Sequence, residues 1–331
     1  MMDQNASDRY RNMPNDALYS NFRNSNWSGS ISTEDRRAMI QEALRRDMAA
    51  QGVAEKDVPL ISFHKEAEMP NCDGMFRESG YGGKEIWINE AMVDNSRIVG
   101  NGEGFDLLNA TFHEGRHAYQ SLALEGKVQK GYEPDEKSME LLRANDHDIV
   151  IVSQGGKVQL GQTYLDGQGG AFSENLYRLQ YKERDADIHA TESVGRIVDR
   201  QKQLTEREQM DPGLSPEARY ANQQDLKDMA NYERVADNYS VTHQIENANN
   251  WYFTSSADRD VDHAMLNLYH GDHAYQADPL IENQVRRESV NSYTRAYNES
   301  RGISAVSRDQ GEQLAQSDQN ISHTASHGRR M

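Results

Sequence analysis

Most of the strand-like sequence lies in an early part of this 331-residue chain, which restricts the folds it can adopt. Three short apolar runs lie at 60–63, 74–76 and 85–89, and the glycines between the last two favour a hairpin. Beyond them only 148–153 and 157–160 resemble strands. Helical periodicity covers 33–51, 104–125, 135–146, 173–205, 215–247, 258–269 and 279–299. We therefore expect an α+β fold, in which a small mixed sheet is followed by a mainly helical C-terminal half.

The organisation along the chain follows from changes in composition. Residues 1–32 are rich in Asn, Ser and Asp and predict a flexible N-terminal arm. The sequence Ser32-Thr33-Glu34-Asp35 is a good helix cap, so we expect the folded core to begin there and to extend over 33–205. Helical patterns continue over 206–299, which we expect to form a helical subdomain. The polar, unpatterned residues 300–331 predict a disordered tail.

Charge and cysteine content exclude several classes of protein. The chain has 36 basic and 53 acidic residues, and the resulting charge of −17 repels a phosphate backbone, so we expect no nucleic-acid partner. Its single cysteine, Cys72, cannot form an internal disulfide, so the chain does not need an oxidising compartment. No run of about 18 apolar residues predicts a membrane span, and the N-terminus has no signal-peptide pattern. We therefore expect a cytoplasmic protein, or one exported without a cleavable signal peptide.

The strongest functional feature is His113-Glu114-Gly115-Arg116-His117, an H-E-x-x-H motif inside the helical segment 104–125. At 3.6 residues per turn, His113 and His117 lie on one face of that helix, where both can ligate one metal ion. Glu114 is rotated from that face by about 100° and can act as a general base beside the metal. The alternative is a surface helix that carries a histidine pair without a metal.

A third ligand is expected from a second helix, because catalytic zinc sites have three protein ligands and an open position. Residues 177–190 contain E-x-x-A-D, with Glu183 and Asp187 one turn apart on one face. The longer Glu183 can reach the metal, while Asp187 can accept a hydrogen bond from the outer nitrogen of a ligating histidine. Glu192 is nine residues from Glu183 and lies on the opposite side of the helix. The alternative is a solvated, charged helix face.

H-E-x-x-H followed by E-x-x-A-D resembles the zincin metallopeptidases whose third zinc ligand is a glutamate, the gluzincins. The nearest pattern is that of soluble bacterial relatives of the CAAX-prenyl endopeptidases, and similar bacterial zincins occur in toxin-like contexts. The resemblance covers about residues 70–195 and implies a zincin-like core with an active-site helix. It implies Zn²⁺ held by His113, His117 and Glu183, and water activated by Glu114. The membrane helices of the CAAX-type enzymes are absent from this sequence.

Several other residues are weaker candidates. Strand 85–89 precedes the motif helix and is either an ordinary hairpin strand or, as in zincins, the sheet edge that pairs with an extended substrate. His189 is more typical of a packed histidine than of a ligand, and Cys72 is more typical of a packed thiol than of a cysteine that caps zinc. His323 and His327 lie in the expected tail without a glutamate. One residue of a later group could stabilise an oxyanion, and the sequence does not select among Tyr252, Asp262, His263, Tyr269, His270, Asp272, His273 and Tyr275.

Two functions from different classes fit these features. One is a zinc-dependent metallopeptidase that hydrolyses a polypeptide, with a toxin- or effector-type protease as a special case. The other is a non-catalytic helical interaction protein with a structural or vestigial metal site, whose long polar helices at 173–247 and 279–299 bind a partner. The intact Glu114 favours the peptidase, because a structural site has no need of a base. The sequence selects no particular substrate and no oligomeric state.

Overall fold

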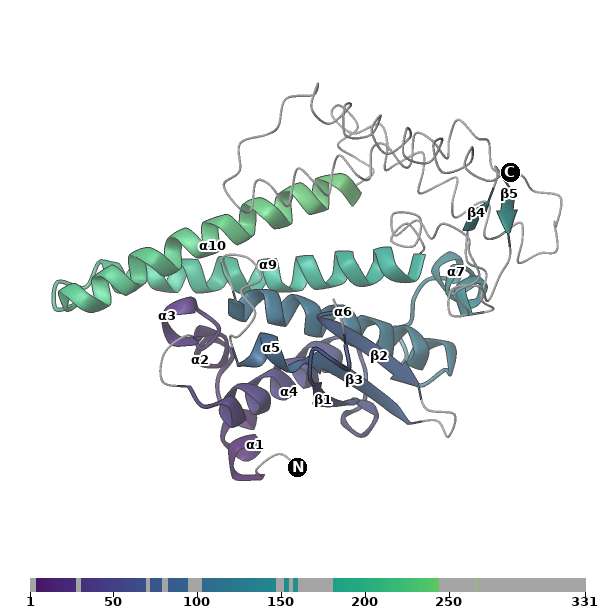
Figure 1. Cartoon of the computed structure of the whole chain (residues 1–331), viewed down its shortest axis with the longest axis horizontal. Helices are drawn as coiled ribbons and strands as arrows, with labels where there is room; N and C mark the ends of the chain where they lie inside the picture. Colours follow the sequence, from purple (N-terminus) through teal and green to yellow (C-terminus); the bar gives the residue numbers. More distant parts are fainter. Residues whose placement is uncertain are drawn as a thin grey trace, which may run out of the picture.

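The predicted helices and strands that fall on described residues occur in the computed structural model in the predicted order, and further short helices lie before and between them (Figure 1). The structure describes residues 4–27, 31–69, 72–78, 83–94, 103–146, 152–154, 157–159, 181–243 and 266. Its helices are α1 (Gln4–Arg11), α2 (Asn15–Ser20), α3 (Asn24–Trp27), α4 (Thr33–Ala50), a short 3₁₀ turn (Glu55–Asp57), α5 (Glu90–Val93), α6 (Glu103–Leu124), α7 (Glu136–Asp146), α9 (Tyr181–Gln209) and α10 (Pro216–His243). Its strands are β1 (Leu60–His64), β2 (Gly74–Glu78), β3 (Lys84–Asn89), β4 (Val152–Gln154) and β5 (Lys157–Gln159). The described part of the chain is thus α+β and mainly helical, as the sequence predicts.

The three early strands form one small mixed sheet in the order β1-β3-β2. β2 and β3 are antiparallel, which confirms the predicted hairpin, and β1 and β3 are parallel. β3 is therefore the central strand, and the alternative that residues 85–89 form a sheet edge is wrong. Strand order depends on where β1 docks, which local sequence does not encode. The edge that faces α6 is β2. β4 and β5 pair separately as a second, antiparallel hairpin.

α4 begins where the capping sequence predicts. The Ser32 hydroxyl oxygen accepts a hydrogen bond from the Asp35 N–H at 3.1 Å, which satisfies one of the free amide groups at the start of the helix. Gly52 follows the last turn with a φ of +77°. Glycine adopts this left-handed conformation without strain and so ends the helix.

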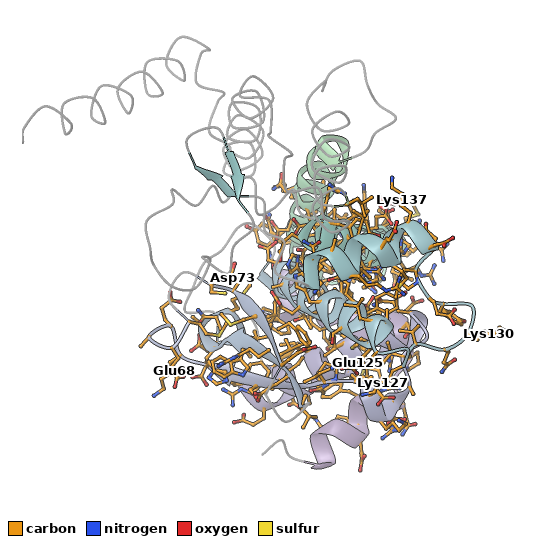
Figure 2. All side chains as sticks on the ribbon, turned by 90° about the vertical axis from the view of Figure 1, so that its right-hand side faces the viewer. Glu68, Asp73, Glu125, Lys127, Lys130 and Lys137 are labelled. Carbon is orange, nitrogen blue, oxygen red and sulfur yellow. The ribbon has the colours of Figure 1, made fainter. Side chains whose placement is uncertain are left out.

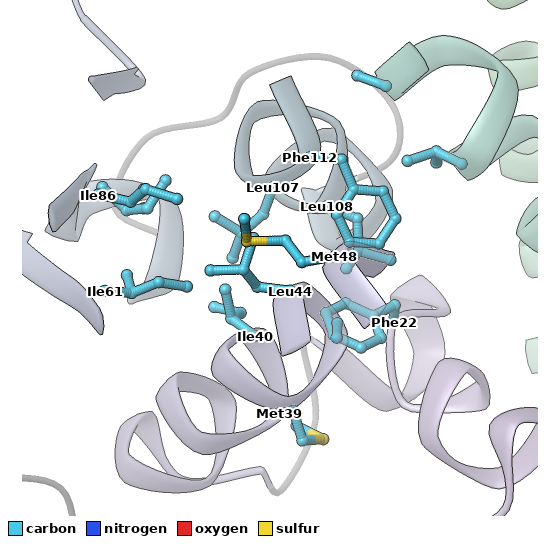
Figure 3. Packing of buried hydrophobic residues seen from close by; sticks show 14 of the residues in the cluster. Phe22, Met39, Ile40, Leu44, Met48, Ile61, Ile86, Leu107, Leu108 and Phe112 are labelled. Carbon is cyan, nitrogen blue, oxygen red and sulfur yellow. The ribbon is translucent and has the colours of Figure 1, made fainter. Parts of the chain in front are cut away.

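The core lies where α4 and α6 pack against one face of the sheet (Figure 3). α4 directs Ile40, Leu44 and Met48 into it at helical spacing, as the periodicity predicts. Gly115 allows α6 to approach α4 closely, because a Cβ at this position would lie 2.6 Å from Leu44 Cδ1. The sheet and α6 contribute Ile61, Ile86, Leu107, Leu108 and Phe112, each at most 5% exposed. Burial of an apolar side chain of this size contributes roughly 1.5–3 kcal/mol, so this layer holds the motif helix in place.

The N-terminal segment is part of this core, so the prediction of a flexible arm over residues 1–32 is wrong for residues 4–27. Four buried side chains of this segment anchor it: Tyr10, Leu18, Phe22 and Trp27. The rings of Phe22 and Trp27 stack with their centroids 5.1 Å apart. A Cβ at Gly104 would lie 2.4 Å from the Phe22 carbonyl oxygen, so the segment lies directly against the start of α6. Composition misled here because the polar residues around these four dominate the average, while a few large side chains suffice to anchor a segment.

α9 and α10 form a long helical pair, and α9 also packs along α6 (Figure 1). α10 joins the same core, since Met229 is fully buried and the Tyr232 ring lies 6.1 Å from the Phe105 ring of α6. The boundary predicted between residues 205 and 206 falls inside the continuous helix α9. The structure therefore gives no reason to separate α10 as a subdomain. The other predicted elements lie outside the described residues, apart from residue 266: helices at 258–269 and 279–299, and the tail at 300–331.

Several charged side chains of the described molecule are exposed, among them Glu125, Lys127, Lys130 and Lys137, which are labelled in Figure 2. Glu125 pairs with Lys127 at 2.7 Å, at the end of α6. Exposed pairs of this kind contribute roughly 0–1 kcal/mol, so they add little to the stability of the fold. None of the helices in the described part of the chain has the length and apolar character needed to cross a bilayer.

Candidate metal centre

Two neighbouring helices bring the three predicted ligands together. α6 carries His113 and His117 one turn apart, and α9 lies beside it with Glu183 in its first turn. The Nε2 atoms of the two histidines are 3.1 Å apart. The Glu183 carboxylate oxygens lie 3.5 Å from His113 Nε2 and 3.4 Å from His117 Nε2. Within the described part of the chain, these side chains form the one group of three or more whose ligand atoms converge in this way.

The spacing of these atoms fits a single metal ion. Ligands about 2.0–2.1 Å from a zinc ion in tetrahedral geometry lie roughly 3.3 Å from one another. The two histidine nitrogens are 3.1 Å apart, close to that value, and they lie 3.5 and 3.4 Å from different oxygens of Glu183, Oε2 and Oε1. When one ligand atom is taken from each residue, the three atoms lie within 4.8 Å of one another. Imidazole nitrogen and carboxylate oxygen are also ligand types that zinc takes. The group could therefore hold a metal ion, and its donor set suits zinc.

Each histidine is also held at its other ring nitrogen. Asp187 Oδ1 lies 2.8 Å from His113 Nδ1, and Gln120 Oε1 lies 2.9 Å from His117 Nδ1. Because both partners present acceptor oxygens, each Nδ1 donates a hydrogen and each Nε2 lone pair is left for the shared space near Glu183. Support of this kind fixes the orientation of a ligating ring and raises its basicity. Asp187 lies where the sequence predicts it, whereas Gln120 was not predicted.

The carboxylates around the histidines favour positive charge at this place. Burial lowers the pKa of His113, but hydrogen bonds to Asp187 and Glu183 outweigh burial and hold this pKa well above its ordinary value. Burial also lowers the pKa of His117, and the charge of Glu183 raises it above its ordinary value. Burial raises the pKa of Glu183, but the two histidines lower it far below its ordinary value. The electrostatics thus suit a cation, whether a proton or a metal ion occupies the ring nitrogens.

Glu114 lies on the side of the group that faces β2. Its side chain is buried, and its Oε2 accepts a hydrogen bond from the Phe76 N–H at 2.6 Å. Gly74 makes room for it, because a Cβ at Gly74 would lie 2.8 Å from Glu114 Cγ. Burial raises the pKa of Glu114 more than the neighbouring histidines and the Phe76 N–H lower it. A carboxylate with a raised pKa is a better proton acceptor than a solvated one, which suits a general base.

Behind the histidines, a polar network ties α6 and α9 to α4. Arg116 donates two hydrogen bonds to the Asp185 carboxylate, at 2.8 and 2.9 Å, and a third to Gln51 Oε1 at 2.7 Å. His189 lies at the α4 end of this network, with its Nε2 3.0 Å from Asp47 Oδ2. His189 is therefore a packed histidine rather than a member of the ligand group, as the sequence favours.

Sequence reasoning missed the residues that hold the ligands from behind, namely Arg116, Gln120 and Asp185. A signal for Gln120 was present, because it follows His117 by three residues and so lies on the same helix face. Asp185 lies between Glu183 and Asp187, and only the packing of α9 on α6 reveals that it faces Arg116.

The remaining candidates stand apart from the group or cannot be placed. Glu192 is exposed and lies near Arg196 on its own helix, at 3.8 Å. Cys72 Sγ donates to the Gly74 carbonyl oxygen at 2.7 Å and is not a member of the ligand group. Ten further candidates lie outside the described residues: Tyr252, Asp262, His263, Tyr269, His270, Asp272, His273, Tyr275, His323 and His327.

Comparison with known proteins adds no assignment: no family model, curated protein or solved structure matches this chain.

Proposed function

We propose that this chain is a zinc-dependent metallopeptidase. The observation that carries the proposal is the convergence of His113 Nε2, His117 Nε2 and the Glu183 carboxylate within 3.5 Å of one another. One ligand atom from each of the three residues lies within 4.8 Å of the others, a spacing compatible with one shared ion, and both histidines are supported at Nδ1. Glu114 adds the feature that a structural site does not need, a buried carboxylate beside the ligands with a raised pKa.

In this proposal the chain supplies ligands, a base and a scaffold. Zinc held by such ligands acts as a Lewis acid on a scissile carbonyl and lowers the pKa of water. Glu114 accepts the proton from water and later delivers it to the leaving amine. The Phe76 N–H holds Glu114 Oε2, so we assign the proton transfer to Oε1. β2 therefore serves as the support that orients the base.

The finer assignments belong to the same proposal. We infer that the ligand set, H-E-x-x-H plus a glutamate on a second helix, makes the chain a zincin of the gluzincin type. The substrate class is then a polypeptide, and a toxin- or effector-type protease is one such enzyme. The alternative of a non-catalytic interaction protein leaves the position of Glu114 without a purpose.

The test is metal content followed by hydrolysis. We expect purified protein to carry about one zinc per chain by mass spectrometry, and His113→Ala to lose it. Glu114→Gln should keep zinc and the fold but cleave a quenched-fluorescent peptide library about 10²- to 10⁴-fold more slowly, because it removes the base and no ligand. Glu192→Gln is the matched control, an exposed glutamate outside the ligand group, and should cleave at the wild-type rate. A folded wild type that takes up no zinc would refute the proposal. Equal cleavage by wild type and Glu114→Gln would refute the role of Glu114 as the base, and zinc binding without cleavage by the wild type would instead favour a non-catalytic site.

A further inference from the structure

Gln120 connects α9 to one of the two histidines through three hydrogen bonds. Its Oε1 lies 2.9 Å from His117 Nδ1. Its Nε2 donates to the Lys182 carbonyl oxygen at 2.9 Å and to Asp185 Oδ2 at 2.8 Å. The side chain is 1% exposed, so water does not compete for these contacts. Gln120 is therefore a built link and not a residue that only fills space.

The two acceptors on α9 decide which way the Gln120 amide points. A backbone carbonyl oxygen and a carboxylate can only accept, so the NH₂ group must face Lys182 and Asp185. The reversed amide would place its oxygen against two other oxygens and its NH₂ group against His117. Asp185 cannot easily move away, because Arg116 holds both of its oxygens. The direction of the amide is thus set from α9.

We propose that Gln120 is a positioning residue through which α9 holds His117 in the tautomer that can ligate a metal. The amide oxygen accepts the hydrogen on Nδ1, and this keeps the Nε2 lone pair toward Glu183 and His113. α9 then supports both histidines, His113 directly through Asp187 and His117 through Gln120. The assignment of the metal as zinc rests on the proposed function, whereas the assignment of the His117 tautomer does not.

The first test compares two buried glutamines. Gln120→Met keeps the length of the side chain but removes both the acceptor and the two donors. Gln201→Met is the matched control: Gln201 is also 1% exposed and lies on α9, where its Nε2 donates to the Asp16 carbonyl oxygen at 3.1 Å. In a zinc titration against a competing chelator, Gln120→Met should bind about 10- to 100-fold more weakly, the range for residues that support a ligand. Gln201→Met should bind as the wild type does. Equal affinities for Gln120→Met and the wild type would overturn the proposal.

The second test reads the tautomer of His117, needs no zinc, and can be decided against the proposal by the wild type alone. Protein with ¹⁵N-labelled histidine rings is kept metal-free at a pH high enough for His117 to be neutral. NMR should then show the hydrogen on Nδ1 of His117 in the wild type and a mixture of tautomers in Gln120→Met. A wild type with the hydrogen on Nε2 would overturn the proposal even if Gln120→Met failed to fold. A wild type that shows the Nδ1 tautomer but takes up no zinc would support this proposal while refuting the metallopeptidase.

Discussion

The two sides of α6 differ in how they are held. The side toward α4 and the sheet is apolar apart from Glu114, and it includes Leu108 and Phe112, which are buried among other hydrocarbon side chains. The side toward α9 carries His113, Arg116 and Gln120, and each of these polar groups meets a specific partner. An apolar interface tolerates exchanges that keep its volume, whereas a buried polar network loses much of its value when one partner is missing.

This difference indicates what each side does for the molecule. Apolar burial accounts for the stability of the fold. Buried charges often give no net stability compared with apolar residues of similar size, because removing them from water is costly. A network such as Arg116, Asp185 and Gln120 at a helix interface is therefore poorly explained by stability alone. Gln120 connects this network to His117, a placement that fits the metal site that we propose.

The largest effect on zinc binding is expected on the polar side of α6, where removal of a metal ligand can be compared with removal of a residue that supports a ligand. Glu183→Ala removes a ligand atom and should abolish stoichiometric zinc binding. Asp187→Ala removes only the acceptor on His113 Nδ1, and should weaken zinc by about 10- to 100-fold while keeping the site. Competition titration with a chelator measures both. If Asp187→Ala abolished binding and Glu183→Ala left it intact, the two roles would be exchanged.

On the apolar side, Leu44→Ala should mainly cost stability. Leu44 is fully buried and lies against the position of a Cβ on Gly115, within the motif itself. The cavity should lower the free energy of unfolding by about 2–5 kcal/mol in urea or thermal denaturation, while zinc still binds to the folded fraction. Leu60→Ala is the control, since Leu60 is 68% exposed, and should change stability little. If Leu44→Ala cost no more than Leu60→Ala, the assigned core would be wrong.

The features that could be predicted from the sequence depend on local patterns, whereas those that could not depend on how separate helices pack together. The core face of α4 and the β2–β3 hairpin depend on local periodicity and turn residues, and both were predicted. Glu183 and Asp187 were found because their i, i+4 spacing is also local. Gln120 acquires its role only when α9 packs against α6, so its function could not be predicted from spacing alone. The N-terminal helices were missed because their few buried side chains lie in polar sequence.

A change of pH should alter both the stability of the metal-free fold and the affinity for zinc through the polar side of α6, and the direction of each change follows from the pKa shifts. Folding raises the pKa of His113 and His117. In metal-free protein this stabilises the fold fully below the pKa of an unfolded histidine, about 6.5, and the contribution is lost as pH rises through the raised values. Zinc must displace these protons, so its affinity should rise with pH, by up to about 100-fold per pH unit where both histidines are protonated.

Thermal melting with and without zinc measures this effect. The difference in melting temperature between the two forms should grow as the pH rises past the ordinary histidine pKa of about 6.5 and should level off only above the raised pKa values of His113 and His117. The lowered pKa of Glu183 keeps that ligand ionised throughout. A zinc effect that does not change with pH would mean that the histidines are not the ligands.

The smallest effect is expected at Glu192 on α9, which belongs neither to the apolar side of α6 nor to the polar network on its other side. Glu192 lies nine residues beyond Glu183, on the opposite side of the helix, and its side chain is 51% exposed. Its contact with Arg196 is 3.8 Å long and solvated, so Glu192→Ala should change the free energy of unfolding by less than about 0.5 kcal/mol. Zinc affinity should equal that of the wild type in the same competition titration. Because Glu192 and Glu183 carry the same group on one helix, a loss of zinc in Glu192→Ala would show that general acidity of α9, and not the position of Glu183, determines binding.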